Sequence, residues 1–210
     1  MTNQTAKVHS IFPTPVYIAK RDSDLIPREK KEIEKIIQEG MTRNDGNASS
    51  ANTYIFDKNL KEIKQFCEQQ IKVYVEEVMN PKEELDFYIT QSWLNITKPS
   101  EFHHEHSHPN SIVSGVFYIE TVEDDKITFF DPNSKIKKLI KFEVENYQTW
   151  NSTSWIFPVR NSELILFPSW LNHGVETNEK ATTDRISISF NTFVKGNLGN
   201  RKRLTELILK

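Results

Sequence analysis

Cysteine, long apolar runs and an excess of charge of either sign are scarce or missing in this sequence, and each shortage excludes a class of protein. The single cysteine, Cys67, cannot form a disulfide within the chain, so a disulfide-rich scaffold is excluded. No stretch approaches the ~18 consecutive apolar residues that a membrane-spanning helix needs. The formal net charge is -2, from 27 basic and 29 acidic residues, which gives no electrostatic reason to expect a nucleic-acid or membrane partner.

Sorting signals and domain boundaries are also lacking. The N-terminus has no basic start followed by an apolar run, so we expect no secretory signal peptide and a cytoplasmic location. No internal repeat, low-complexity stretch or long linker divides the chain. We therefore expect one domain over residues 1–210, with a strand and helices in 1–80, a β core in 81–200 and a tail in 201–210.

Two helices are predicted near the N-terminus. Pro27 opens a polar helical run that ends near Gly40, the arrangement typical of a helix start and stop. Residues 60–79 carry apolar side chains three or four positions apart, which predicts a second helix that ends before Pro81. Between the helices, residues 41–54 are rich in turn formers and predict a mobile loop.

The second half of the chain consists of short segments rich in β-branched and aromatic residues, which is typical of strands. Six segments are predicted as strands, residues 86–97, 111–122, 126–131, 137–144, 163–170 and 185–194. Helices followed by strands predict an α+β chain whose β part is a sandwich or distorted barrel, with the helices packed on one sheet. The tail, residues 200–210, is predicted to form a short closing helix.

Four of the six histidines lie close together in the stretch EFHHEHSHPNS, residues 101–111. If this stretch is an extended strand, alternation puts His104, His106 and His108 on one face and His103 on the other. Two imidazoles two positions apart on a strand can bind one metal ion. The stretch therefore predicts a metal site, and the alternative is a polar surface loop.

A metal site needs a further ligand, and His173 is the best candidate. It follows the strongly apolar segment 163–170 and is followed by Gly174, which lets the backbone turn closely. The alternative interpretation is that His173 is a capping residue at a strand end.

The last predicted strand alternates between polar and apolar residues. Its polar face is either in water or lines a wet pocket inside a barrel. In the second case Arg185, 12 residues after His173, would return beside the metal and could bind a carboxylate through charge-assisted hydrogen bonds. The polar face consists of Arg185, Ser187, Ser189 and Asn191.

Four motifs occur in a fixed order: a histidine pair, SGVFY, FP-x-x-x-x-H and R-x-S. They lie in HSHPNSIVSGVFYI, LILFPSWLNHGVE and RISISFN, and together they resemble the 2-oxoglutarate/Fe(II)-dependent oxygenase superfamily. The nearest match is a small family of oxygenases from marine bacteria and phages of cyanobacteria, and a phage origin would place the protein in the host cytoplasm. SIFPTPVYIAK and SWLNIT also look like this family's pattern, so the resemblance covers most of the chain, and residues 134–157 are least characteristic.

The resemblance implies a double-stranded β-helix, a jelly-roll or cupin-like barrel with iron at one open end. It implies a dioxygenase that uses iron(II), 2-oxoglutarate and O2 to hydroxylate a C–H bond, releasing succinate and CO2. By the same resemblance Arg185 binds the far carboxylate of 2-oxoglutarate, helped by Ser187. Asn95 and Tyr118 would be further cosubstrate contacts, and the alternative is that both are ordinary strand residues.

One position departs from the superfamily pattern. The usual ligands are two histidines and one carboxylate, but His108 occupies the carboxylate position two residues after His106. The metal and catalytic residues are then His106, His108 and His173, or else the first pair is His104 and His106 with His108 in support. We favour the first set, because H-x-H-P is the stretch that matches the family.

Two rival functions remain from the sequence alone. One is a cupin-like enzyme with three histidine ligands and no 2-oxoglutarate, and the other is a non-catalytic barrel that binds metal. The cupin glutamate is absent from PNSIVS, and Arg185 would lose its role in such an enzyme.

The substrate is a small molecule or a protein side chain, and dimerisation stays open. The aromatic segment 146–159 is a lid over the substrate or, as we favour, a hydrophobic cover for the barrel.

Overall fold

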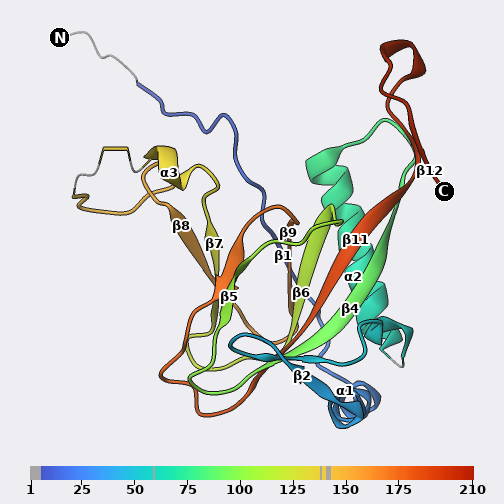
Figure 1. The fold of residues 1–210 in the computed structure, drawn as a ribbon, viewed down its shortest axis with the longest axis vertical. Helices are drawn as coiled ribbons and strands as arrows, with labels where there is room; N and C mark the ends of the chain where they lie inside the picture. The colour runs from blue at the N-terminus through green and yellow to red at the C-terminus, as the bar shows by residue number, and fades with distance from the viewer. Residues whose placement is uncertain (1–5, 59, 138, 141–142) are drawn as a thin grey trace.

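Two stacked β-sheets form the body of the protein, as the computed structural model shows (Figure 1). The structure describes residues 6–58, 60–137, 139–140 and 143–210. The large sheet has the strand order β1-β9-β6-β11-β4-β3-β2, with β12 paired to β11. Its strands are β1 (Tyr17–Lys20), β2 (Met41–Arg43), β3 (Ala48–Ser50), β4 (Asp86–Thr97), β6 (Val113–Glu120), β9 (Glu163–Pro168), β11 (Arg185–Leu198) and β12 (Leu207–Leu209).

The small sheet has the order β5-β10-β7-β8 and faces one side of the large sheet. Its strands are β5 (His103–His106), β7 (Lys126–Phe130), β8 (Ser154–Pro158) and β10 (His173–Val175). The predicted strands at 86–97, 126–131, 163–170 and 185–194 are confirmed.

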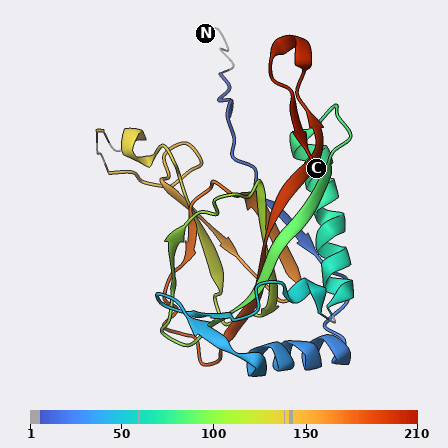
Figure 2. The same ribbon diagram turned by 45° about the vertical axis from the view of Figure 1, so that its right-hand side comes forward.

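Both predicted helices are present and pack on the other side of the large sheet (Figure 2). They are α1 (Pro27–Glu39) and α2 (Lys61–Tyr74), which continues into a π-helical turn, η2 (Val75–Met79). The apolar positions of α2 step by three or four residues, so one face is buried against the sheet. Cys67 on that face is fully buried and acts as a small apolar filler, as expected.

The large sheet is buried on both faces, and strand β11 shows how the two faces differ. Ile188 and Phe190 pack in the cluster that holds the helices. Because side chains alternate along a strand, the polar residues between them face the small sheet. Ser187 and Ser189 are buried there, so the polar face of this strand lines the interior of the barrel rather than the solvent.

Several local predictions are wrong. Residues 41–54, predicted as a mobile loop, contain the hairpin β2–β3, in which Ser49 pairs with Asn95 of β4. The tail forms a short 3-10 turn, η3 (Arg201–Arg203), and strand β12 instead of a helix. Of the predicted strand 137–144, Lys137 ends the helical turn α3 (Ser134–Lys137), residues 139–140 and 143–144 are not in a strand, and 138 and 141–142 lie outside the described residues.

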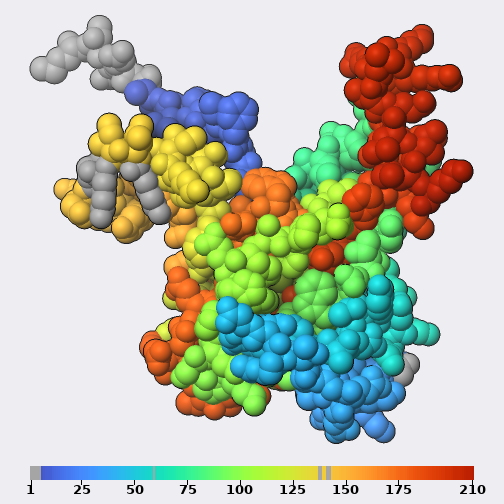
Figure 3. All heavy atoms as spheres, in the orientation of Figure 1, coloured from blue at the N-terminus to red at the C-terminus, as the bar shows by residue number. Residues whose placement is uncertain are grey.

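Besides the N-terminal segment before β1, two parts of the described chain project from the body (Figure 3). One is the C-terminal hairpin of β11 and β12, and the other is the segment around α3 between β7 and β8. Tyr147 and Trp150 in this second projection are 79% and 53% exposed, so this half of the aromatic segment does not cover the barrel, whereas Phe157 in β8 packs against the core between the sheets. No helix in the part of the chain that the structure describes is long and apolar enough to span a membrane.

Candidate active site

Three imidazoles meet at one end of the barrel. His106 ends β5 and pairs directly with His173 at the start of β10, and His108 follows β5 by two residues. One nitrogen from each of the three histidines lies within 4.8 Å of the others, and the Nε2 atoms of His108 and His173 are 3.3 Å apart. Three imidazoles at this separation could hold one metal ion.

Hydrogen bonds to the backbone orient two of these rings. His106 Nδ1 lies 2.8 Å from the carbonyl oxygen of His104, and His173 Nδ1 lies 3.0 Å from that of Leu171. A carbonyl oxygen can only accept a hydrogen bond, so each Nδ1 carries the proton and donates. Each Nε2 then keeps its lone pair for a metal, which is the usual orientation of a histidine ligand.

A β-bulge in β5 corrects the predicted alternation of the histidines. His106 pairs with His173 but His103 pairs with Val175, so three steps along β5 match two along β10. His103 therefore joins His106 in the interior, where the two rings stack at 4.4 Å, whereas His104 is exposed. Gly174 lies opposite the bulge, and a Cβ there would stand 2.9 Å from the carbonyl oxygen of His103.

The four interior histidines are held in the neutral form. Burial, and then the neighbouring imidazoles, lower the pKa of His103 to about 3 and that of His108 to about 4. Burial also lowers the pKa of His106, and it lowers the pKa of His173 well below its usual range. Neutral imidazole is the form that binds metal, so protons compete little with a metal ion for these nitrogens near neutral pH.

The stability of the metal-free protein should therefore fall as the pH drops from 6.5 towards 4. An unfolded histidine takes up a proton near its ordinary pKa of 6.5, whereas the folded chain keeps His103 and His108 neutral to about pH 3 and 4. The unfolded state binds more protons in this range, so acid favours unfolding, and full stability is kept above pH 6.5. Urea unfolding across this range measures the slope of the free energy of unfolding against pH.

The matched variants separate this effect from the titration of carboxylates. The double variant His103→Asn/His108→Asn should show a shallower slope than the wild type. His9→Asn, in the exposed N-terminal segment, should leave the slope unchanged. An equal slope in the wild type and the double variant would contradict the prediction.

A second polar group lies deeper in the barrel, on the large sheet. Ser187 of β11 pairs with Asn95 of β4 on one side and with Tyr118 of β6 on the other. Arg185 starts the same strand, and its guanidinium carbon lies 5.1 Å from the centre of the Tyr118 ring. All four side chains are buried, so the structure brings together the four residues predicted at the cosubstrate site.

These four residues differ in what they can offer a ligand. The Asn95 amide donates to Ser189 Oγ and accepts from Ser49 Oγ, both at 2.9 Å, so half of its hydrogen-bonding capacity is used. The Tyr118 hydroxyl, by contrast, is buried beside Arg185, which can only donate, and its O–H has no acceptor within the described residues. Burial raises its pKa, although Arg185 opposes this, so it stays a protonated donor. A buried donor without a partner is costly, which suits a site that takes a ligand.

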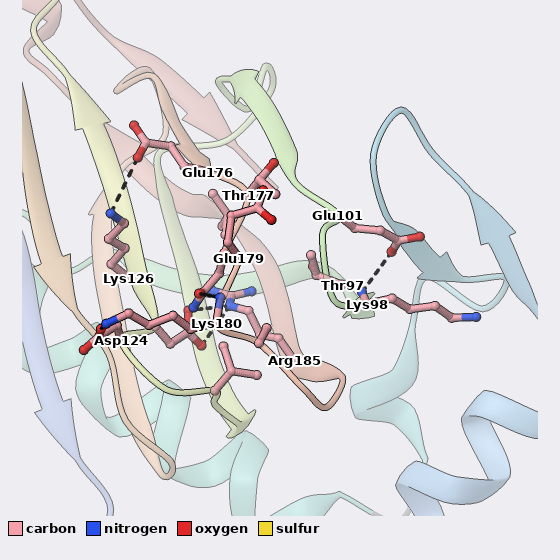
Figure 4. A pocket seen from close by; sticks show the side chains of 15 residues that line it. Thr97, Lys98, Glu101, Asp124, Lys126, Glu176, Thr177, Glu179, Lys180 and Arg185 are labelled. Atoms are coloured by element: carbon pink, nitrogen blue, oxygen red, sulfur yellow. Dashed lines mark hydrogen bonds and ion pairs between the residues drawn. The ribbon is translucent and has the colours of Figure 1, made fainter.

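Sequence reasoning missed one residue of this group, Asp125. Its two carboxylate oxygens accept hydrogen bonds from Nε of Arg185 at 2.9 and 3.0 Å. Nothing in the turn between β6 and β7 distinguishes Asp125 from the adjacent Asp124. Both residues line a cavity of about 250 Å³ that reaches Arg185, together with Lys98, Lys126 and Lys180 (Figure 4).

The comparisons with known proteins agree with this geometry. A family model described as "Putative 2OG-Fe(II) oxygenase" matches residues 91–191, which include the three imidazoles and Arg185. The chain belongs to the 2-oxoglutarate/Fe(II)-dependent oxygenase superfamily. It is therefore an enzyme that uses iron(II), 2-oxoglutarate and O2. A search of curated proteins gave no match.

Solved oxygenases share the fold at low sequence identity. An oxidoreductase of the 2OG-Fe(II) oxygenase family from Burkholderia pseudomallei is 9% identical, with a TM-score of 0.54 over 84% of this chain and 83% of that one. The carbocyclase SnoK from nogalamycin biosynthesis is 12% identical, with a TM-score of 0.59 over 85% and 79%. HygX from Streptomyces hygroscopicus, solved with nickel, 2-oxoglutarate and hygromycin B, is 10% identical, with a TM-score of 0.54 over 85% and 82%. These likenesses confirm the double-stranded β-helix.

One tryptophan lies beside the imidazoles, and a second stands two strands away on the small sheet. The Trp93 ring, on β4, lies 5.9 Å from the ring of His108. On the small sheet His173 pairs with Phe129, and Phe129 pairs with Trp155 of the edge strand β8. Cross-strand partners share one face of a sheet, so Trp155 stands in the same row as His173. It is 43% exposed, which places an accessible indole at the rim of the site.

Proposed function

We propose that this oxygenase hydroxylates a C–H bond of its substrate at an iron(II) ion held by His106, His108 and His173. The convergence of these three imidazoles carries the proposal. In His106 and His173 the Nδ1 atom donates to the backbone, which leaves the Nε2 lone pair available to a metal. When bound, iron(II) and 2-oxoglutarate activate O2 for insertion of one oxygen atom into the substrate, and succinate and CO2 are released. All three protein ligands are neutral, so the site carries one negative charge less than the usual two-histidine, one-carboxylate set.

Arg185 would bind the far carboxylate of 2-oxoglutarate. Its guanidinium is buried beside the Tyr118 ring on the large sheet, and burial strengthens a charge-assisted hydrogen bond. The Tyr118 hydroxyl beside it supplies a further donor that has no other partner among the described residues. Ser187, between Asn95 and Tyr118 in the register, completes the polar lining, and this support for a dicarboxylate favours the oxoglutarate reading over a three-histidine cupin.

His103 would lie along the path between the two ends of the cosubstrate. Its ring stacks on that of His106, and it is close enough to Arg185 for that charge to lower its pKa. It therefore helps to define the width of the cosubstrate space. The substrate, a small molecule or a protein side chain, would enter at the rim where Trp93 and Trp155 stand, and these indoles offer apolar contact surface.

Anaerobic titration of the iron(II) protein with 2-oxoglutarate tests the proposal. We expect a saturable visible charge-transfer band from the iron chelate, because iron and the keto acid must be bound side by side. Arg185→Ala should weaken 2-oxoglutarate binding strongly and leave iron binding intact. Bound iron without any band in the wild type would contradict the proposed function.

A further inference from the structure

Asp125 and Arg185 form a buried ion pair whose geometry is one-sided. Their side chains are 2% and 6% exposed. Both hydrogen bonds leave Arg185 from Nε, so Asp125 uses neither of the two terminal nitrogens of the guanidinium. The terminal nitrogens are the ones that form the parallel pair of bonds with a second carboxylate. Asp125 therefore holds the arginine without occupying the edge that a dicarboxylate would use.

The backbone around Asp125 is itself fixed. Its N–H donates to the carbonyl of Val122 at 3.2 Å, and its own carbonyl accepts from the N–H of Val159 at 3.0 Å. These bonds place the carboxylate in the turn that leads into β7 of the small sheet, whereas Arg185 starts a strand of the large sheet. The guanidinium is thus held along one edge by Asp125 and across one face by the Tyr118 ring.

Stability alone does not explain such a pair. Removing two charges from water costs about as much as their attraction returns, so buried ion pairs add little net stability. A role in orienting the Arg185 guanidinium would explain why the pair is buried. Two hydroxyls near the guanidinium, those of Thr97 and Tyr118, are buried and have no acceptor for their O–H groups among the described residues, and Thr97 is the cross-strand partner of Arg185. The polar groups around Arg185 are therefore arranged for one more acceptor.

We propose that Asp125 is the positioning residue that orients Arg185 towards the far carboxylate of 2-oxoglutarate. This inference rests on the proposed function, in which Arg185 binds that carboxylate. Without Asp125 the guanidinium would keep its charge but would no longer be held in one orientation. Part of the free energy of 2-oxoglutarate binding would then be needed to order the guanidinium. The loss of affinity on removal of Asp125 should therefore be confined to ligands that carry the far carboxylate.

Two keto acids separate this role from a general structural one. The iron(II) proteins are titrated without oxygen with 2-oxoglutarate and with 2-oxobutanoate, which chelates iron but lacks the far carboxylate. In Asp125→Ala we expect the Kd of 2-oxoglutarate to rise about 10- to 100-fold, as large an effect as the loss of an outer partner has on a metal ligand. The Kd of 2-oxobutanoate and the affinity for iron should not change.

Asp125→Asn keeps the test usable if Asp125→Ala does not fold, because the amide oxygen of asparagine can still accept a hydrogen bond from Nε of Arg185. It should show a smaller loss of the same selectivity. Asp124→Asn, the adjacent residue whose carboxylate pairs with Lys180 at the surface, is the matched control and should bind both keto acids normally.

Three outcomes would overturn the inference. Equal weakening of both keto acids would show a structural role, unchanged binding would show no role, and tighter 2-oxoglutarate binding would show that Asp125 competes for Arg185. Failure of the proposed function gives a different result, because the wild type itself would then form no band with either keto acid.

Discussion

Replacing His173 with alanine should abolish iron binding and, with it, all 2-oxoglutarate turnover. His173 is the most buried of the three imidazoles, and its ring contacts those of both His106 and His108. Loss of an outer partner of a metal ligand typically costs ~10- to 100-fold in affinity, and loss of a ligand itself should cost more. Competition with a coloured chelator, using iron(II) or cobalt(II), measures the affinity.

His104→Ala is the matched control for this prediction. His104 belongs to the same histidine-rich stretch, but its side chain is exposed and lies outside the cluster of three. Its removal should change iron affinity by only a few-fold. A loss equal to that of His173→Ala would favour the alternative ligand pair, His104 and His106.

The second large effect is expected at His108, where two substitutions should differ sharply. His108→Ala removes a ligand, so iron affinity and the visible band should both be lost. His108→Asp places a carboxylate two residues after His106, which restores the usual ligand set of this superfamily. We expect iron binding and the band to return in this variant, because the added negative charge attracts the cation.

The pair of variants makes this prediction specific to coordination. Thermal unfolding of the metal-free variants checks that both fold, since each removes the same half-buried ring from its place beside Trp93. If His108→Ala keeps wild-type iron affinity, His108 is not a ligand. If His108→Asp binds no better than His108→Ala, the position cannot present a carboxylate to the metal.

Elements with strong periodicity were predictable from the sequence. The helices α1 and α2 bury one apolar stripe each, so their spacing is visible in the residues alone. The first half of strand β11, residues 185–191, alternates between polar and apolar side chains, and its polar face lies inside because it faces the small sheet. The likeness of the motifs to a known superfamily, rather than periodicity, indicated which polar residues should gather around the metal and cosubstrate.

Features that depend on pairing between distant strands were not predictable. The bulge that turns His103 inward exists only because β5 pairs with β10 opposite Gly174. Strand β10 has three residues, too few to show alternation. Asp125 looks like any acidic turn residue until the fold places it against Arg185, 60 positions away. The hairpin in 41–54 is rich in turn formers, and its strands form because β3 pairs with the edge of β4.

The two ends of the proposed cosubstrate site belong to different layers of the barrel. His106 and His173 come from the small sheet, whereas Arg185, Ser187 and Tyr118 come from the large one. The apolar side chains packed between the layers, such as Val116, Ile127 and Phe167, set how far apart these layers stand. The packing of the barrel core thus determines which length of keto diacid fits the proposed site. A chain one methylene shorter or longer than 2-oxoglutarate could reach the metal or the arginine, but not both without deforming a close-packed interior.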